Sequence, residues 1–250
     1  MPPKKIESNS CGYVCSVSVA IGDGIVSVGA DIAYGIERSF EGLGGKGQRR
    51  VLQIGFENEF LVKHLQQLFK IGYQSYKNPL TKLISSILVK YYSHLPDDVL
   101  AGLAKKAGVI LTNTAAKQVG KKIGKKIAEK VAVKIAQRIA ATAAMKTLGK
   151  RVGISASVSA TGVGIPISMV MLQGLAQKSS KASQRLRGML PDLWLSLRGE
   201  EGLDMLYFLI EEPFKDHVNF IRDAKKSTDK YQIYVERLRH RLKKNESQSN

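Results

Sequence analysis

A small residue returns at every fourth position along one stretch of this chain, and this repeat constrains how the stretch can fold. The centre of the repeat reads KKIG and then KKIA over residues 121–128. Small side chains at this spacing let two helix backbones approach closely. We predict a helix that packs through Ala116, Gly120, Gly124, Ala128, Ala132, Ala136 and Ala140.

The same repeat carries an aliphatic row and a basic row. Isoleucine or valine comes directly before most of the small residues, and lysine occupies most of the remaining positions. A row of lysines beside an aliphatic stripe attracts anionic surfaces. The side chains predicted to contact anionic lipid or phosphate are Lys117, Lys121, Lys122, Lys125, Lys126, Lys130, Lys134 and Arg138.

Helix geometry limits what the small residues can do. Four residues overshoot one helical turn by about 40°, so the row winds slowly around the helix. A partner helix would therefore cross at an angle, or the helix would break near Gly120 and Gly124, which each weaken it by roughly 1 kcal/mol. The alternative reading is an alanine-rich helix of a soluble bundle whose lysines are merely solvated.

The positive charge of the chain is concentrated around this repeat. The net charge is +18, and residues 101–151 supply +12 of it, with thirteen basic residues against one acid, Glu129. Such a concentration implies an anionic partner: nucleic acid, anionic lipid or an acidic protein. Between Lys105 and Lys150 there is no aromatic residue and only one arginine. This composition disfavours specific nucleic-acid recognition.

An uncharged segment follows the basic repeat. Residues 152–177 contain no charged side chain over 26 positions, and about 20 residues suffice to cross a bilayer. Serine, glycine and Pro166 dilute the apolar content, so we expect conditional insertion against partner helices; a buried hairpin or loop in a soluble core is the alternative. The predicted inserting residues are Val152, Ile154, Val158, Val163, Ile165, Ile167, Met169, Val170 and Leu172.

Helical periodicity and start signals dominate the rest of the chain. Asn78 with Pro79, and Pro96 with two aspartates, mark helix starts. Pro191 is predicted to start a helix that runs on to Pro213, followed by two more helices. Residues 14–36 fit either a β-hairpin or a small-residue helix. The predicted fold is mainly α: a multi-helix bundle with a long basic helix, a concealed hydrophobic hairpin over 131–177, and a small β-hairpin near the N-terminus if residues 14–36 contain strands.

Composition divides the chain into five parts. A flexible tail over 1–10 precedes a Gly/Ser-rich segment over 11–50. Amphipathic helices are expected over 51–98, the basic helix and the uncharged segment over 99–178, and a C-terminal helical region over 179–250. Since residues 1–10 are polar and lack a leucine-rich core, we predict no Sec signal. The expected site of synthesis is the cytoplasm, with export by another route and action at a target-cell membrane.

Catalytic and metal-binding patterns are missing from the sequence. None of the Gly-Lys dipeptides has the flanking residues of a phosphate loop, and the four histidines lack metal-ligand companions. Cys11 and Cys15 are interpreted as free thiols. We expect no cofactor and no metal, and nothing points to an enzyme. Four acidic pairs are assigned to helix ends, where the helix dipole accounts for them: Glu57/Glu59, Asp97/Asp98, Glu200/Glu201 and Glu211/Glu212.

These patterns together favour a membrane-active protein. We expect a pore-forming or permeabilising, toxin-like effector that binds anionic bilayers and inserts the helical hairpin. Expected partners are anionic lipids, further copies of the chain and an acidic neutralising protein. Two alternatives stay open: a sequence-nonspecific nucleic-acid binder that uses the lysines, and a helical structural or partner-binding protein.

Overall fold

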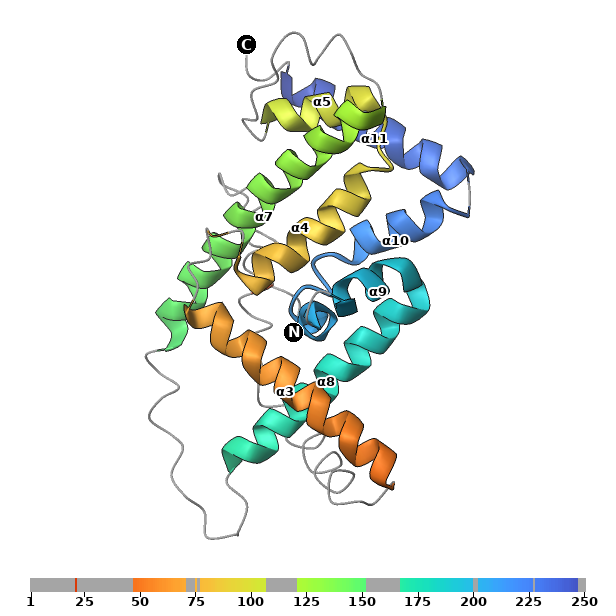
Figure 1. The fold of residues 1–250 in the computed structure, drawn as a ribbon. Helices are drawn as coiled ribbons and strands as arrows, with labels where there is room; N and C mark the ends of the chain where they lie inside the picture. The colour runs from red at the N-terminus through yellow and green to blue at the C-terminus, as the bar shows by residue number, and fades with distance from the viewer. Residues whose placement is uncertain are drawn as a thin grey trace, which may run out of the picture.

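Helices account for 87% of the residues that the structure describes, and no strand occurs among them (Figure 1). The computed structural model describes Ile21, Ser75 and residues 47–70, 77–106, 121–151, 167–199, 202–226 and 228–246. The predicted mainly α, multi-helix fold is confirmed. Of residues 14–36 only Ile21 is described, and it is helical and fully buried; the alternative β-hairpin otherwise lies outside the described residues.

The long basic helix forms as predicted and lies along a strongly apolar helix. This basic helix, α7 (Lys121–Arg151), packs against α4 (Pro79–Tyr92), and the two run side by side in Figure 1. Helix α4 begins at the predicted signal, because Asn78 Oδ1 accepts a hydrogen bond from Leu80 N at 3.0 Å. α4 is almost entirely buried and forms the centre of the core.

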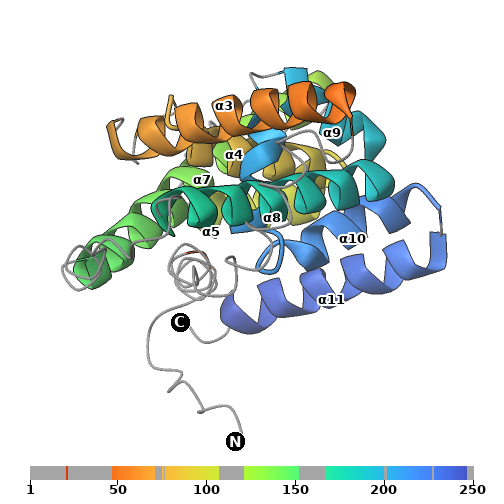
Figure 2. The ribbon, with the colours of Figure 1, turned by 90° about the horizontal axis from the view of Figure 1, so that it is seen from below.

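Two long helices cross at the other end of the molecule. Helix α3 (Gln48–Lys70) crosses α8 (Ile167–Met189), and Figure 2 shows α3 on one side of α8 with α10 and α11 on the other. Asn58 of α3 donates a hydrogen bond to Gln173 of α8 at 3.3 Å. Residues 167–177 of the uncharged segment thus form the first half of α8, whereas 152–166 lie outside the described residues.

The predicted helix from Pro191 to Pro213 is wrong, because it divides into two. Helix α9 (Pro191–Gly199) is followed by the 3-10 helix η3 (Leu203–Leu209). Gly202 has a positive φ of 81°, which other residues rarely adopt. A Cβ at this position would also lie 3.0 Å from Phe60 Cγ of α3. Close contact with a distant helix therefore turns the chain here.

The remaining helices cover the far side of α4. Helix α5 (Asp97–Lys106) contacts both α7 and α11 (Thr228–Glu246), and α10 (Lys215–Ala224) packs on α4 and α11. Arg239 of α11 pairs with Asp98 of α5 at 2.7 Å. In the described part of the chain, no helix combines the length and the apolarity that crossing a bilayer requires.

Candidate functional site: the basic face of helix α7

The four-residue repeat gives α7 two opposite faces. Residues two positions apart point about 200° away from each other on a helix. From Gly124 to Ala140, each small residue of the repeat lies two positions after a basic residue, as Ala128 follows Lys126 and Ala132 follows Lys130. When the small row faces the core, the basic row must therefore face outward.

The small row lies in the core. Four of the predicted packing residues are at most 1% exposed: Ala128, Ala132, Ala136 and Ala140. Val131 and Ile139 are fully buried on the same side, and α4 is the helix that α7 contacts most extensively. Short side chains let the two backbones approach closely along this contact.

The basic row lies on the outside. Lys125, Lys126, Lys130 and Arg138 are exposed, and Lys134 is half-buried. At 1.5 Å per residue, the row from Lys126 to Arg138 extends about 18 Å along the helix. Its C-terminal end borders a shallow hollow of about 410 Å³, lined by Lys134, Gln137, Arg138, Ala141 and Thr142. The hydroxyl of Thr142 donates to the Arg138 carbonyl oxygen at 2.9 Å, so it stays on the helix backbone.

Acidic groups interrupt the basic face near the start of α7. A cleft of about 540 Å³ between α4, α7 and α9 brings Lys125 and Lys90 together with Glu129 and Asp192. Asp192 accepts a hydrogen bond from Lys225 at 2.7 Å, and this bond lowers the pKa of the Asp192 carboxyl. Lys126, Lys130, Lys134 and Arg138 do not line this cleft.

Several predicted residues cannot be placed as side chains. Ala116, Lys117 and Gly120 lie outside the described residues, as do Val152, Ile154, Val158, Val163 and Ile165. Lys121, Lys122 and Gly124 belong to the first turns of α7, and Ile167, Met169, Val170 and Leu172 to the first turns of α8; for these only the helical backbone is described. Both arms of the predicted hairpin over 131–177 are helical, and the connection between them is outside the description.

Sequence reasoning missed a buried polar cluster, which we call the serine cluster: Ser179, Ser180, Ser183, Glu57, Asp204, Trp194 and Arg198. The three serines of α8 bond to three different elements. Ser179 donates to the Met205 carbonyl of η3, and Ser180 donates to Glu57 of α3 at 3.1 Å. Ser183 donates to Asp204 and accepts from Trp194 Nε1 of α9 at 2.9 Å.

The charged members of the serine cluster are deeply placed. Asp204 is fully buried, and Arg198 donates to its Oδ2 at 3.2 Å. Its Oδ1 has no hydrogen-bond partner among the residues that the structure describes. Glu57 is 4% exposed in the middle of α3, so its assignment to a helix end is wrong. Helical periodicity could have predicted that the three serines are buried, because they share one face of α8 with apolar residues. This face contains Ala176, Ser179, Ser180, Ser183 and Leu186.

Comparisons with known proteins add no family or relative. No protein-family model matches the chain, and neither a curated protein nor a solved structure matches it. No group of His, Cys, Asp or Glu residues in the described ranges could hold a metal ion.

Proposed function

We propose that the protein binds the anionic surface of a lipid bilayer through the outer face of α7. The observation that carries this proposal is the alternation on one helix: a basic row every four residues outside, and a small-residue row against α4 inside. Since packing fixes the inner face, the outer cations are held on a rigid helix, each turned by about 40° from the one before. An anionic surface can then contact several of them at once.

The electrostatic attraction between these four cations and an anionic membrane sets the affinity that the basic face of α7 can reach without other contacts. Each Lys or Arg near an anionic membrane surface contributes about 1 kcal/mol. Lys126, Lys130, Lys134 and Arg138 together would contribute about 4 kcal/mol, equivalent to a Kd of about 1 mM. Binding through this face is therefore reversible, and stable attachment needs a second contribution.

We further propose insertion of the hairpin over 131–177 as that second contribution, with self-association leading to permeabilisation. The aliphatic side of α7 is committed to α4 in the described structure, so insertion requires α7 to separate from α4. Surface binding and permeabilisation are thus distinct steps, measured separately by sedimentation with vesicles and by release of trapped dye.

The vesicle experiment compares charge at the proposed face with charge elsewhere. A Lys126→Gln/Lys130→Gln/Arg138→Gln variant should lose sedimentation with phosphatidylserine-containing vesicles by at least tenfold. The matched control, Lys77→Gln/Lys82→Gln/Lys226→Gln, removes three exposed lysines from other surfaces and should bind like the wild type. Equal losses in both variants, or equal binding to neutral vesicles, would contradict the proposal.

The same experiment separates the alternatives. Helix α7 contains no aromatic residue on which a base could stack, which favours lipid over single-stranded nucleic acid. A salt-dependent gel shift without vesicle binding would instead assign the face to nucleic acid. Co-purification of an acidic protein that the triple variant no longer retains would assign it to a neutralising partner.

A further inference from the structure

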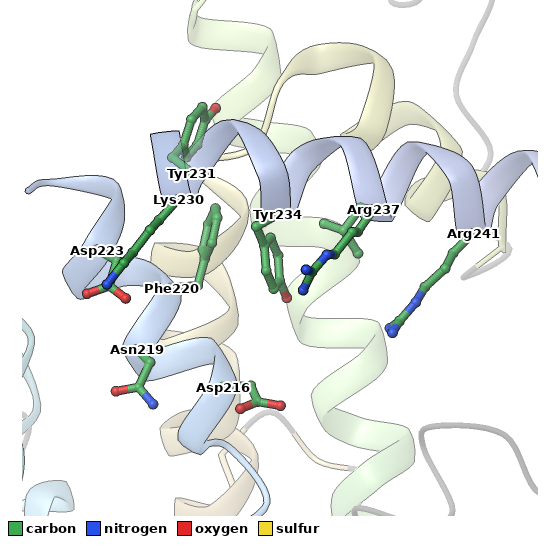
Figure 3. A pocket seen from close by; sticks show the side chains of 10 residues that line it. Asp216, Asn219, Phe220, Asp223, Lys230, Tyr231, Tyr234, Arg237 and Arg241 are labelled. Atoms are coloured by element: carbon green, nitrogen blue, oxygen red, sulfur yellow. The ribbon is translucent and has the colours of Figure 1, made fainter. Parts of the chain in front are cut away.

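Helices α10 and α11 enclose a second polar site, the α10–α11 groove, with a volume of about 360 Å³ (Figure 3). This volume lies within the usual range for small-molecule pockets. The groove is lined by Asp216, Asn219, Phe220 and Asp223 of α10 and by Lys230, Tyr231, Tyr234, Arg237, Leu238 and Arg241 of α11.

The two walls of the groove carry opposite charge. The α11 wall supplies cations and the α10 wall supplies carboxylates. At one end Asp223 already has a partner within the protein. Arg222 donates a hydrogen bond to the Asp223 carboxylate at 2.9 Å and lowers its pKa. Figure 3 shows Lys230 extending toward the same carboxylate.

At the other end of the groove lie charged side chains that form no ion pair with a described residue. Among the described residues, no ion pair joins Asp216, Arg237 or Arg241 to any partner. In Figure 3, Arg237 and Arg241 extend from α11 toward the side of the groove where Asp216 leaves α10. Two guanidinium groups four residues apart on one helix repel each other, so an anion placed between them would be stabilised.

An aromatic floor lies between these charges. Phe220 packs against Tyr234 with ring centroids 4.4 Å apart. The Tyr234 hydroxyl is engaged with the Tyr91 hydroxyl at 3.0 Å, and Tyr231 donates to the His94 carbonyl at 2.8 Å. Because both hydroxyls bond to α4 or the turn after it, the rings present mainly hydrocarbon to the groove.

Both charges act on the hydroxyl of Tyr234. Burial raises the pKa of Tyr234, and the hydrogen bond with Tyr91 lowers it. Smaller opposing effects on the pKa come from Asp216, which raises it, and from Arg241, which lowers it. A ligand lying over Tyr234 would therefore meet a negative group on one side and a positive group on the other.

We propose that this end of the groove binds a zwitterionic phosphate ester that carries a primary amine. Arg237 and Arg241 bind the phosphate oxygens, for which guanidinium groups are well suited. Asp216 accepts hydrogen bonds from the ammonium group, and the connecting carbons lie over Tyr234. A plain anion would leave Asp216 without a partner, and a plain cation would be repelled by the two arginines, so a ligand that carries both charges matches the site best.

The test uses phosphoethanolamine as the probe, with inorganic phosphate and ethanolamine as its fragments. Isothermal titration should show phosphoethanolamine binding at least tenfold more tightly than either fragment. Arg237→Gln/Arg241→Gln should weaken it by about tenfold or more, because the phosphate would lose both guanidinium donors. Asp216→Asn should abolish the preference for phosphoethanolamine over phosphate. Lys243→Gln, an exposed position on the same helix outside the groove, is the control and should bind normally.

A vesicle arm distinguishes a soluble ligand from a lipid headgroup. Neutral phosphatidylcholine vesicles are compared with and without phosphatidylethanolamine at one salt concentration. Retention that requires phosphatidylethanolamine and disappears in Asp216→Asn identifies the headgroup as the source, whereas binding of the probe in solution alone identifies a soluble metabolite. Absence of binding in both arms, equal affinity for phosphate, or indifference to Asp216→Asn would overturn the proposal. The α7 triple variant should bind the probe normally, so this test is independent of the basic face.

Discussion

Helices α7 and α8 are held to the rest of the molecule by different chemistry. α7 presents alanine, valine and isoleucine to α4. α8 presents three buried serines to two carboxylates, an indole and a backbone carbonyl. Apolar packing depends on size and shape, whereas a buried polar contact depends on each partner being present. The two interfaces should therefore fail under different substitutions.

The largest effect is expected in the serine cluster when its cation is removed. Arg198→Met should lower the free energy of unfolding by about 3 kcal/mol, because Asp204 would stay buried without its charged partner. Denaturation in urea measures this loss. Arg185→Met removes an exposed arginine paired with Glu211 at 2.6 Å, and it should change stability by about 1 kcal/mol or less. Equal effects would show that the buried position of Asp204 does not matter.

Replacing a small side chain of α7 by a larger one tests the interface between α7 and α4. Ala136→Leu should destabilise the protein by about 2 kcal/mol, because its fully buried position leaves no room for three further carbons. The matched control is Ala141→Leu, which lies on the same helix beside the shallow hollow and should change stability by about 0.5 kcal/mol or less. If both leucines are tolerated, α7 does not pack closely on α4.

Acid should weaken the α4 side of the molecule through His217. Burial lowers the pKa of His217 to about 4, below its ordinary value of 6.5. The unfolded chain therefore takes up this proton first, so stability present above pH 6.5 is lost as the pH falls toward 4. Between pH 7 and pH 5 the loss should be about 2 kcal/mol. Urea titrations of the wild type and of His217→Gln at both pH values measure it, and parallel losses in the two proteins would exclude His217 as the cause.

Removing a single hydroxyl from the serine cluster should have a smaller effect on stability. Ser180→Ala removes the hydrogen bond to the nearly buried Glu57 and should cost about 1 kcal/mol. Ser85→Ala is the comparison, because its hydroxyl donates to Lys82 O at an exposed position on α4. That variant should unfold within about 0.5 kcal/mol of the wild type. A neutral Ser180→Ala would indicate that Glu57 finds another donor.

The smallest effect is expected on the outside of α7. Lys126→Gln/Lys130→Gln removes two like charges one turn apart, and stability should rise by about 0.3 kcal/mol. Thermal unfolding at low salt is the sensitive measurement. A clear loss of stability would mean that these exposed lysines support the fold, and the vesicle result would then need reinterpretation.

Local signals predicted much of the fold, because they depend on neighbouring residues. The cap at Asn78, the two aspartates at the start of α5 and the repeat of α7 each lie within one or two turns of helix. The turn at Gly202 could not be predicted in this way, since its cause includes Phe60, which belongs to a distant helix.

The same limit applies to the two sites. The basic row of α7 follows from a period within one helix, so its outward direction could be inferred once the small row was assigned to packing. The buried role of Glu57 depends on Ser180, and the α10–α11 groove depends on Asp216 facing Arg237 and Arg241. These pairings arise between elements, and a single sequence does not encode them in any local spacing.

The bond between Trp194 and Ser183 gives the molecule a built-in optical reporter. Trp194 is the only tryptophan in the chain; its indole donates to α8, and the Arg187 guanidinium lies 4.9 Å from its ring. Any departure of α8 from α9 would expose this indole to water and shift its emission to longer wavelength. Fluorescence of the unlabelled protein can therefore follow α8 while vesicles are added.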